Sequence, residues 1–170
     1  MNKKDKVWYA CYGSNLCADR FKYYIVGGDC LYNGKHYDGC EDKTMWTESR
    51  VRRFKGDLYF ANVSRFWGGK GVAFFDPDGT GTVIMRLYQI TYGQFLDVQQ
   101  QEGPLPNWYG RTVLLGADET GIPIYTFTSA QRGLPNPPAD QYLAVIREGL
   151  VNGCGIGEAE VNAYLQSAIE

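Results

Sequence analysis

A strand pattern, a glycine and a helix pattern follow one another at the start of the chain. Side chains alternate along residues 6–12, which is typical of an extended strand. Residues 16–25 have a helical apolar face, made of Cys17, Phe21, Tyr24 and Ile25, and Gly27 ends it. We therefore expect a strand, a tight turn at Gly13 and a helix that Ser14 or Asn15 caps.

Further strand patterns occupy residues 56–62, 71–75, 82–91, 109–115 and 122–127. The segment 76–81 is expected to be a hairpin turn between paired antiparallel strands, and residues 29–53 lack a pattern, which predicts a functional loop or flap packed by its own side chains. A capping box, Thr91 with Gln94, opens a helix that ends at Glu102, and residues 139–152 and 158–168 form two more helices. The sum is an α+β fold, a mainly antiparallel sheet flanked by helices.

The chain has 170 residues, which predicts a single domain over 1–170. Its net charge of −2 argues against nucleic acid and anionic membranes as partners and favours a small neutral or zwitterionic molecule. No apolar run is long enough to span a membrane, and no cleavage site follows the basic start. Five cysteines, an odd number, indicate reduced thiols. We therefore expect a cytoplasmic protein.

The turn Tyr12-Gly13-Ser14-Asn15-Leu16 leaves amide groups unpaired at the start of a helix. Such amides can hold a carboxylate or an oxyanion, and a glycine lets a ligand approach closely. Gly13 could instead serve only the tight turn, because strand–glycine–helix turns are common. The pattern alone leaves both interpretations open.

Glu102 is a carboxylate at the C-terminal end of a helix, where the helix dipole disfavours a negative charge. Phe95, Leu96, Trp108 and Tyr109 lie near it in the sequence and would shield it from water. A shielded carboxyl can serve as a general acid or base. A solvated helix-end glutamate is the alternative.

With the YGSNL turn, Leu96-Asp97, Glu102-Gly103 and Tyr109, the chain resembles the γ-glutamylcyclotransferase family. The glycine-rich 68–71 segment, Tyr125, and the prolines and Tyr142 before the terminal helices follow in a similar order, so the resemblance spans nearly the whole chain. It implies a twisted, barrel-like, mainly antiparallel sheet flanked by helices. The 27–53 segment is longer than the family pattern leads us to expect.

The resemblance also implies an activity, the cyclisation of a γ-glutamyl amide or γ-glutamyl amino acid to 5-oxoproline with release of the amine. Glu102 would be the catalytic proton shuttle. The residues expected to bind the substrate are Tyr12, Gly13, Ser14, Asn15, Leu16, Tyr109, Tyr125 and Tyr142. The amine of the substrate is its own nucleophile, so the reaction needs no metal and no cofactor is expected.

Two hypotheses from other classes stay open. The same fold could be a non-catalytic module that binds a small molecule or peptide under a flap formed by residues 29–53. Cys30, His36 and Cys40 could instead hold a structural zinc ion, although no paired C-x-x-C motif is present. A homodimer through Trp8 and the C-terminal helices is also left open.

Overall fold

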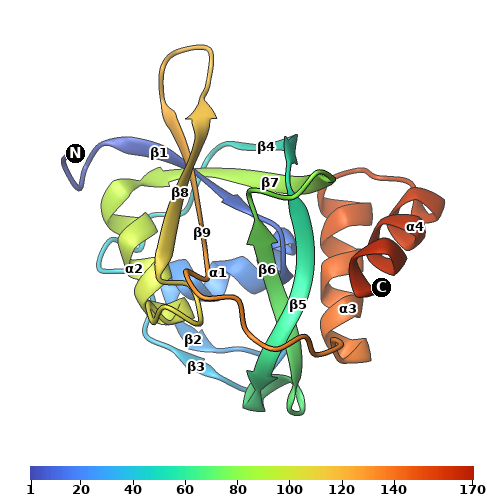
Figure 1. The fold of residues 1–170 in the computed structure, drawn as a ribbon. Helices are drawn as coiled ribbons and strands as arrows, with labels where there is room; N and C mark the ends of the chain where they lie inside the picture. Colours follow the sequence, from blue (N-terminus) through green and yellow to red (C-terminus); the bar gives the residue numbers. More distant parts are fainter.

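The computed structural model describes residues 1–170 and is built on a five-stranded sheet (Figure 1). The strands are β1 (Lys6–Cys11), β4 (Ser49–Lys55), β7 (Thr82–Thr91), β8 (Arg111–Ala117) and β9 (Pro123–Thr128), in the order β4-β7-β1-β9-β8. All neighbours are antiparallel except β1 and β9, which are parallel. The predicted α+β class with a mainly antiparallel sheet is confirmed. The sheet has free edges at β4 and β8 and does not close into a barrel.

Two smaller hairpins stand apart from this sheet. They are β5 (Asp57–Ser64) with β6 (Lys70–Asp76), and β2 (Gly28–Asp29) with β3 (His36–Tyr37). The prediction of a hairpin across residues 76–81 was wrong, because β6 pairs with β5 whereas β7 pairs with β4 and β1. The turn instead carries the chain from the two-stranded ribbon into the main sheet.

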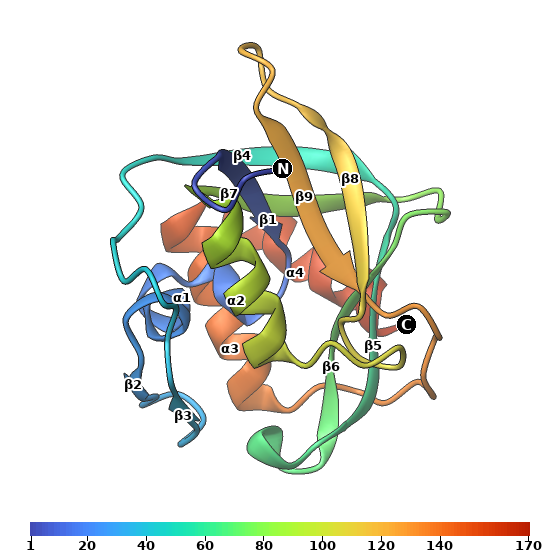
Figure 2. The same cartoon turned by 90° about the vertical axis from the view of Figure 1, so that its left-hand side faces the viewer.

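The helices lie on both sides of the β5–β6 ribbon, with α1 and α2 on one side and α3 and α4 on the other (Figure 1). They are α1 (Ala18–Val26), α2 (Tyr92–Glu102), α3 (Asp140–Glu148) and α4 (Glu158–Ile169), and a π-helical turn, Gly149–Gly153, extends α3. Figure 2 shows α2 standing in front of the sheet with α3 and α4 farther back. α2 contacts β1 and β7, so the start of the chain and the middle of the chain meet there.

The capping box of α2 forms as predicted. The Gln94 amide donates to Thr91 Oγ1 at 3.1 Å, and the Thr91 amide donates to Gln94 Oε1 at 3.1 Å. Gly103, with a φ of 107°, ends the helix directly after Glu102. The carboxyl of Glu102 therefore has the predicted place at the end of α2.

The predicted cap of the first helix was wrong. A 3₁₀ turn, Ser14–Leu16, follows β1, and α1 begins only at Ala18 with Cys17 as a cap that makes no side-chain hydrogen bond. The side chain of Asn15 is used elsewhere, since it donates to Tyr9 and Glu102. Asn15, one of the two expected caps, therefore makes tertiary hydrogen bonds and does not cap α1.

The prediction of one loop or flap across residues 29–53 was also wrong in part. Its first half forms the β2–β3 hairpin, and its last residues form the edge strand β4. Most side chains of β4, including Arg52 and Lys55, are exposed. Because an edge strand with so much solvent contact shows no apolar alternation, it left no recognisable pattern.

Forty buried hydrophobic side chains form one cluster that joins the sheet to α3 and α4. From Val7 to Cys11 every side chain of β1 is buried, because the strand lies in the middle of the sheet and is covered on both faces. The residues that follow β1 are therefore attached to the most enclosed part of the core.

No helix of the chain has both the length and the apolar character needed to cross a bilayer.

Candidate active site

A cavity of about 470 Å³ opens beside the turn that follows β1. Its wall includes residues 12–15, the end of α2 at Glu102, the β2–β3 hairpin, the β5–β6 bend and Tyr142 of α3. Pockets of this size accommodate small ligands. The turn and Glu102, which are far apart in the sequence, thus share one cavity.

Asn15 joins the turn directly to Glu102. Its Nδ2 donates to Glu102 Oε1 at 3.1 Å and to the Tyr9 hydroxyl at 3.1 Å. Glu102 is half-buried, and its Oε2 accepts no hydrogen bond within the chain. Asn15 Oδ1 is buried without a partner. One carboxylate oxygen is therefore fixed in place while the other remains available to a ligand.

The backbone of the turn is held as firmly as the Asn15 side chain. The Tyr88 hydroxyl donates to the Asn15 carbonyl at 2.7 Å. Inside the 3₁₀ turn, the amides of Leu16 and Cys17 donate to the carbonyls of Gly13 and Ser14, so the amides of Ser14 and Asn15 take no part in these two bonds. The Ser14 amide lies within hydrogen-bonding reach of the Tyr142 hydroxyl, so the Asn15 amide is the donor that the turn keeps at its N-terminal end.

Gly13 is required by close packing. A Cβ at this position would lie 3.1 Å from the Tyr142 hydroxyl oxygen and 3.2 Å from Cβ of Ala73. The glycine thus lets the turn approach α3 and β6, and the chain's own side chains fill the space beside it.

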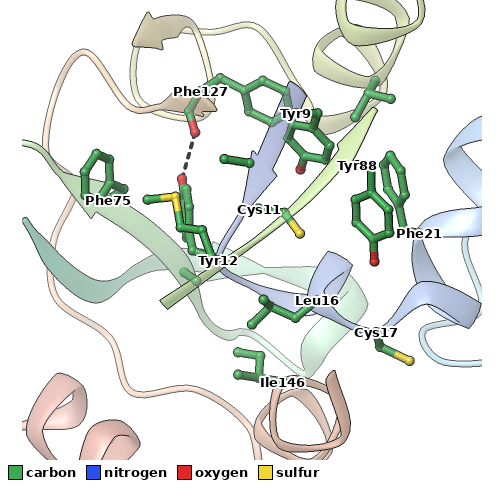
Figure 3. Close-up of a cluster of buried hydrophobic side chains, with 14 of the residues drawn as sticks. Tyr9, Cys11, Tyr12, Leu16, Cys17, Phe21, Phe75, Tyr88, Phe127 and Ile146 are labelled. Carbon is green, nitrogen blue, oxygen red and sulfur yellow. Dashed lines mark hydrogen bonds between the residues drawn. The ribbon is translucent and has the colours of Figure 1, made fainter. Parts of the chain in front are cut away.

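Three tyrosine hydroxyls of the cavity wall are fixed by backbone groups. Tyr12 donates to the carbonyl of Phe127 at 2.7 Å (Figure 3), and Tyr109 donates to the carbonyl of Ala73 at 2.8 Å. The Tyr142 hydroxyl accepts from the Ala73 amide at 2.9 Å. Burial raises the pKa of each of these three phenols above its usual value. They therefore act as neutral hydroxyls that shape the wall.

Two residues that the family resemblance implies as substrate-binding, Tyr125 and Leu16, lie outside the cavity wall. Tyr125 packs against Tyr92 and Phe95 of α2, at ring-centroid distances of 6.4 and 5.7 Å. Phe127, two residues farther along β9, lines the cavity instead. Leu16 is fully buried in the core, toward Ile146 of α3 (Figure 3).

Arg20 is a cavity residue that the sequence analysis missed. It is 3% exposed, and its Nη2 donates to the phenolic oxygens of Tyr37 at 2.7 Å and Tyr24 at 3.3 Å. Its Nε and Nη1 have no hydrogen-bond partner. A buried guanidinium ordinarily has a carboxylate partner, so an unpaired one in a cavity wall favours an anionic ligand.

Lys35 of the β2–β3 hairpin is a second missed cation. Its Nζ donates to the carbonyl of Gln101 at 3.3 Å, next to Glu102, and lies 5.0 Å from the centroid of the Tyr37 ring. Burial lowers its pKa, and the charge of Glu102 opposes that shift. The position of Lys35 is visible only in the folded hairpin, because residues 29–53 gave no pattern.

The candidate zinc ligands do not come together. Cys40 is buried, and its thiol donates to the carbonyl of Tyr24 at 3.2 Å; Cys30 is buried as well. His36 is exposed and lies 2.7 Å from Asp29. The chain holds no group of three His, Cys, Asp or Glu side chains arranged to bind a metal ion.

Solved structures with the same fold cover nearly the whole chain. A γ-glutamyl cyclotransferase aligns with a TM-score of 0.70 and 19% identity over 98% of this chain and 89% of its own. An uncharacterised protein from Homo sapiens aligns with a TM-score of 0.70 and 20% identity, covering 97% and 88%. YkqA from Bacillus subtilis aligns with a TM-score of 0.64 and 18% identity, covering 98% of this chain and 55% of its own.

The fold is that of γ-glutamyl cyclotransferase.

At the sequence level the chain is similar to histone deacetylase 5 of Arabidopsis thaliana, with 32% identity over 206 aligned positions. The alignment covers 98% of this chain and 31% of that protein, so the chain spans about a third of the curated relative it matches. The name of that protein therefore describes a much longer chain. No protein-family model matches the sequence.

Within the γ-glutamyl cyclotransferase fold, most of the expected site residues meet at one cavity. Tyr12, Gly13, Ser14 and Asn15 line it on one side, and Glu102, Tyr109 and Tyr142 line it on the others. The expected juxtaposition of the turn and the mid-chain carboxylate is therefore present as geometry. Tyr125 and Leu16 are outside it, and Arg20 and Lys35 are additions.

Proposed function

We propose that the protein is a γ-glutamylcyclotransferase-like enzyme. It converts a γ-glutamyl amide or γ-glutamyl amino acid into 5-oxoproline and releases the amine. The observation that carries the proposal is the hydrogen bond between Asn15 and Glu102 in the wall of one cavity. The fold shared with a solved γ-glutamyl cyclotransferase supports it.

The substrate supplies its own nucleophile. Its α-ammonium gives a proton to the Glu102 carboxylate, and the free amine then attacks the γ-carbonyl carbon. A new carbon–nitrogen bond closes the five-membered ring, and the bond between that carbon and the departing nitrogen breaks. Glu102 passes this proton to the departing nitrogen as the bond breaks. Ring closure leaves a second proton on the new ring nitrogen, and Glu102 carries this one to the released amine, which departs as an ammonium ion while the carboxylate is regenerated.

The residues around Glu102 have separate tasks in this scheme. Asn15 holds Oε1 and leaves Oε2 to exchange the proton. The backbone amide of Asn15 supplies a donor for the substrate carboxylate or for the oxyanion that forms at the γ-carbonyl. The neutral hydroxyls and rings of Tyr12, Tyr109 and Tyr142 enclose the curled substrate.

The charge of the wall suits such a substrate. A γ-glutamyl compound carries an ammonium and at least one carboxylate, and the cavity offers Glu102 together with the buried guanidinium of Arg20. The ammonium would face the carboxylate, while Arg20 supplies a positive field for the substrate carboxylate.

The test is product formation from a panel of γ-glutamyl amino acids, γ-glutamyl amines and glutathione, with 5-oxoproline as the readout. Glu102→Gln keeps the shape of the side chain and an acceptor for Asn15, and it should lower kcat by about 10²- to 10⁴-fold. Glu48→Gln, the same change at an exposed carboxyl outside the cavity, is the matched control and should leave kcat unchanged.

Two results would contradict the proposal. One is a Glu102→Gln protein that turns over at the wild-type rate. The other is the absence of product from every compound while calorimetry shows binding to both proteins, which would favour a non-catalytic module that binds a small molecule or peptide.

A further inference from the structure

The cavity holds four charged side chains that are not paired with each other. They are Arg20, Lys35, Arg65 and Glu102. None of them takes part in an ion pair within 4.0 Å anywhere in the chain. Three cations therefore face one carboxylate, and this excess of positive charge is left for a ligand to balance.

The three cations differ in depth. Arg20 is the innermost, at 3% exposure, Lys35 is half-buried, and Arg65 is exposed. Tyr37 connects the first two, because it accepts a hydrogen bond from Arg20 and lies under the Lys35 ammonium. Phe66 connects the last two, with Lys35 Nζ 5.2 Å and the Arg65 guanidinium carbon 4.9 Å from its ring centroid. The positive charges thus line one side of the cavity from its interior to its mouth.

Lys35 is the cation best placed between the reacting carboxylate and the mouth. Its Nζ donates to the carbonyl of Gln101, the residue before Glu102, at 3.3 Å, and packs over the rings of Tyr37 and Phe66. An ammonium has three donors, and this one uses a single one of them within the chain. The side chain is positioned while its charge and two donors stay free.

We infer that Lys35 is a specificity-determining residue that selects leaving groups bearing a carboxylate. The inference rests on the proposed function, because it places the ring-forming half of the substrate at Glu102. The proton shuttle must contact both nitrogens, so the departing nitrogen also lies at Glu102, and the remainder of the leaving group extends toward the mouth past Lys35. With Arg20 facing the carboxylate of the glutamyl half, Lys35 faces a second carboxylate, and Arg65 adds to the field at the mouth.

A purely structural role for Lys35 makes a different prediction. A lysine that donates to the last turn of a helix stabilises that helix through its dipole. Loss of such a contact would affect every substrate alike, since it acts on α2 as a whole. A change in the preference between two substrates that differ only in one carboxylate would not follow from it.

The test compares γ-glutamyl-alanine with the same compound carrying a terminal carboxamide, in turnover and in binding. Binding is measured by calorimetry on the Glu102→Gln background, where no product interferes. We expect the wild-type protein to prefer the acid by about tenfold or more, the strength of a hydrogen bond to a charged group. Lys35→Met should abolish this preference with little effect on the amide, and Lys35→Arg should restore part of it.

Lys43→Met is the matched control. Lys43 also belongs to residues 29–53, and its Nζ donates to the backbone carbonyls of Asp38 and Cys40. Its side chain is not part of the cavity wall. The control should keep the wild-type preference.

The inference would be overturned if Lys35→Met lowered turnover and binding equally for the acid and the amide, or if the wild-type protein showed no preference between them. Binding with a Lys35-dependent preference but without any product would uphold the inference and overturn the proposed reaction alone. Neither binding nor turnover of either compound would overturn both.

Discussion

Asn15 Nδ2 lies 3.1 Å from Glu102 Oε1, so an amide from the turn after β1 fixes the carboxylate at the end of α2. The same amide group also contacts the Tyr9 hydroxyl at 3.1 Å. The angle at which the carboxylate faces the cavity is therefore set by a residue that is itself held by the central strand.

Asn15→Asp should impair turnover through Glu102. The new carboxylate would lie beside Glu102, and repulsion between the like charges would keep a proton on the pair to higher pH. We expect kcat to fall by about tenfold or more, and the acidic limb of the pH–rate profile to move toward higher pH. Steady-state kinetics across pH measure both effects. An unshifted profile with only KM altered would indicate that Asn15 contacts substrate without positioning Glu102.

Gly13→Ala should affect activity through Tyr142. The added methyl group would lie 3.1 Å from the Tyr142 hydroxyl and 3.2 Å from Cβ of Ala73, so these neighbours or the turn must move by a few tenths of an ångström. The double variant with Tyr142→Phe removes the hydroxyl and should recover part of the lost kcat/KM. Tyr142→Phe by itself should lower the free energy of unfolding by about 1–3 kcal/mol, because the buried Ala73 amide loses its acceptor. If the loss of kcat/KM in the double variant equals the two single-variant losses combined, expressed as free energies, the added methyl group and the Tyr142 hydroxyl do not compete for space.

Gly149→Ala should destabilise the protein and disturb the site from a distance. A Cβ at Gly149 would contact the backbone of Leu16 and lie 2.6 Å from the Cys17 amide nitrogen, directly behind the turn that carries Asn15. We expect the free energy of unfolding to fall by about 1–3 kcal/mol, measured with urea. Gly157→Ala, with no atom within 4 Å of the added methyl group, is the control and should cost about 0.5 kcal/mol as a weaker helix cap. Equal effects of the two changes would refute the packing argument.

Asp118 should make a pH-dependent contribution to stability. The indole of Trp8 donates to Asp118 Oδ2 at 2.8 Å, and this hydrogen bond, with help from Thr120 and Ile122, holds the pKa of the carboxyl well below its usual range. A depressed pKa stabilises the fold above the unfolded-state value of about 3.9 and loses that effect as pH falls toward the folded-state value.

Asp118→Asn should therefore be less stable than the wild-type protein at neutral pH. The difference in the free energy of unfolding between the two proteins should become smaller below about pH 4. Urea unfolding at several pH values measures this. Asp78→Asn, at an exposed carboxyl, is the control. A gap that stays constant with pH would mean that ionisation of Asp118 does not contribute.

Local signals predicted much of the fold because they report local interactions. The capping box at Thr91 and the stop at Gly103 fixed both ends of α2, and with them the place of Glu102. The edge strand β4 gave no comparable signal, because its exposed charged side chains follow no apolar period. Strand pairing also escaped prediction at residues 76–81, where the partners of β6 and β7 come from other parts of the chain.

Site residues that belong to a recognisable sequence motif were predicted. Those that only tertiary packing brings to the cavity were missed. The YGSNL turn and Glu102 could be named from the sequence, although the hydrogen bond between them could not. Arg20 looks like an ordinary polar residue on an amphipathic helix, and its importance lies in a missing partner, which only coordinates reveal. Tyr125 and Phe127 share one face of β9, and nothing local tells which of them reaches the cavity.

The place of β1 between β7 and β9 has a consequence for how the protein acquires its site. β1 pairs with β7, which begins at Thr82, and with β9, which begins at Pro123. Both pairings join segments far apart in the sequence and therefore close long loops. Such nonlocal pairing slows folding, since loop-closure entropy is lost before the contacts compensate for it. A nascent chain whose β9 is still inside the ribosome lacks the strand beside β1, so the cavity wall that includes Phe127 forms only after β9 has emerged.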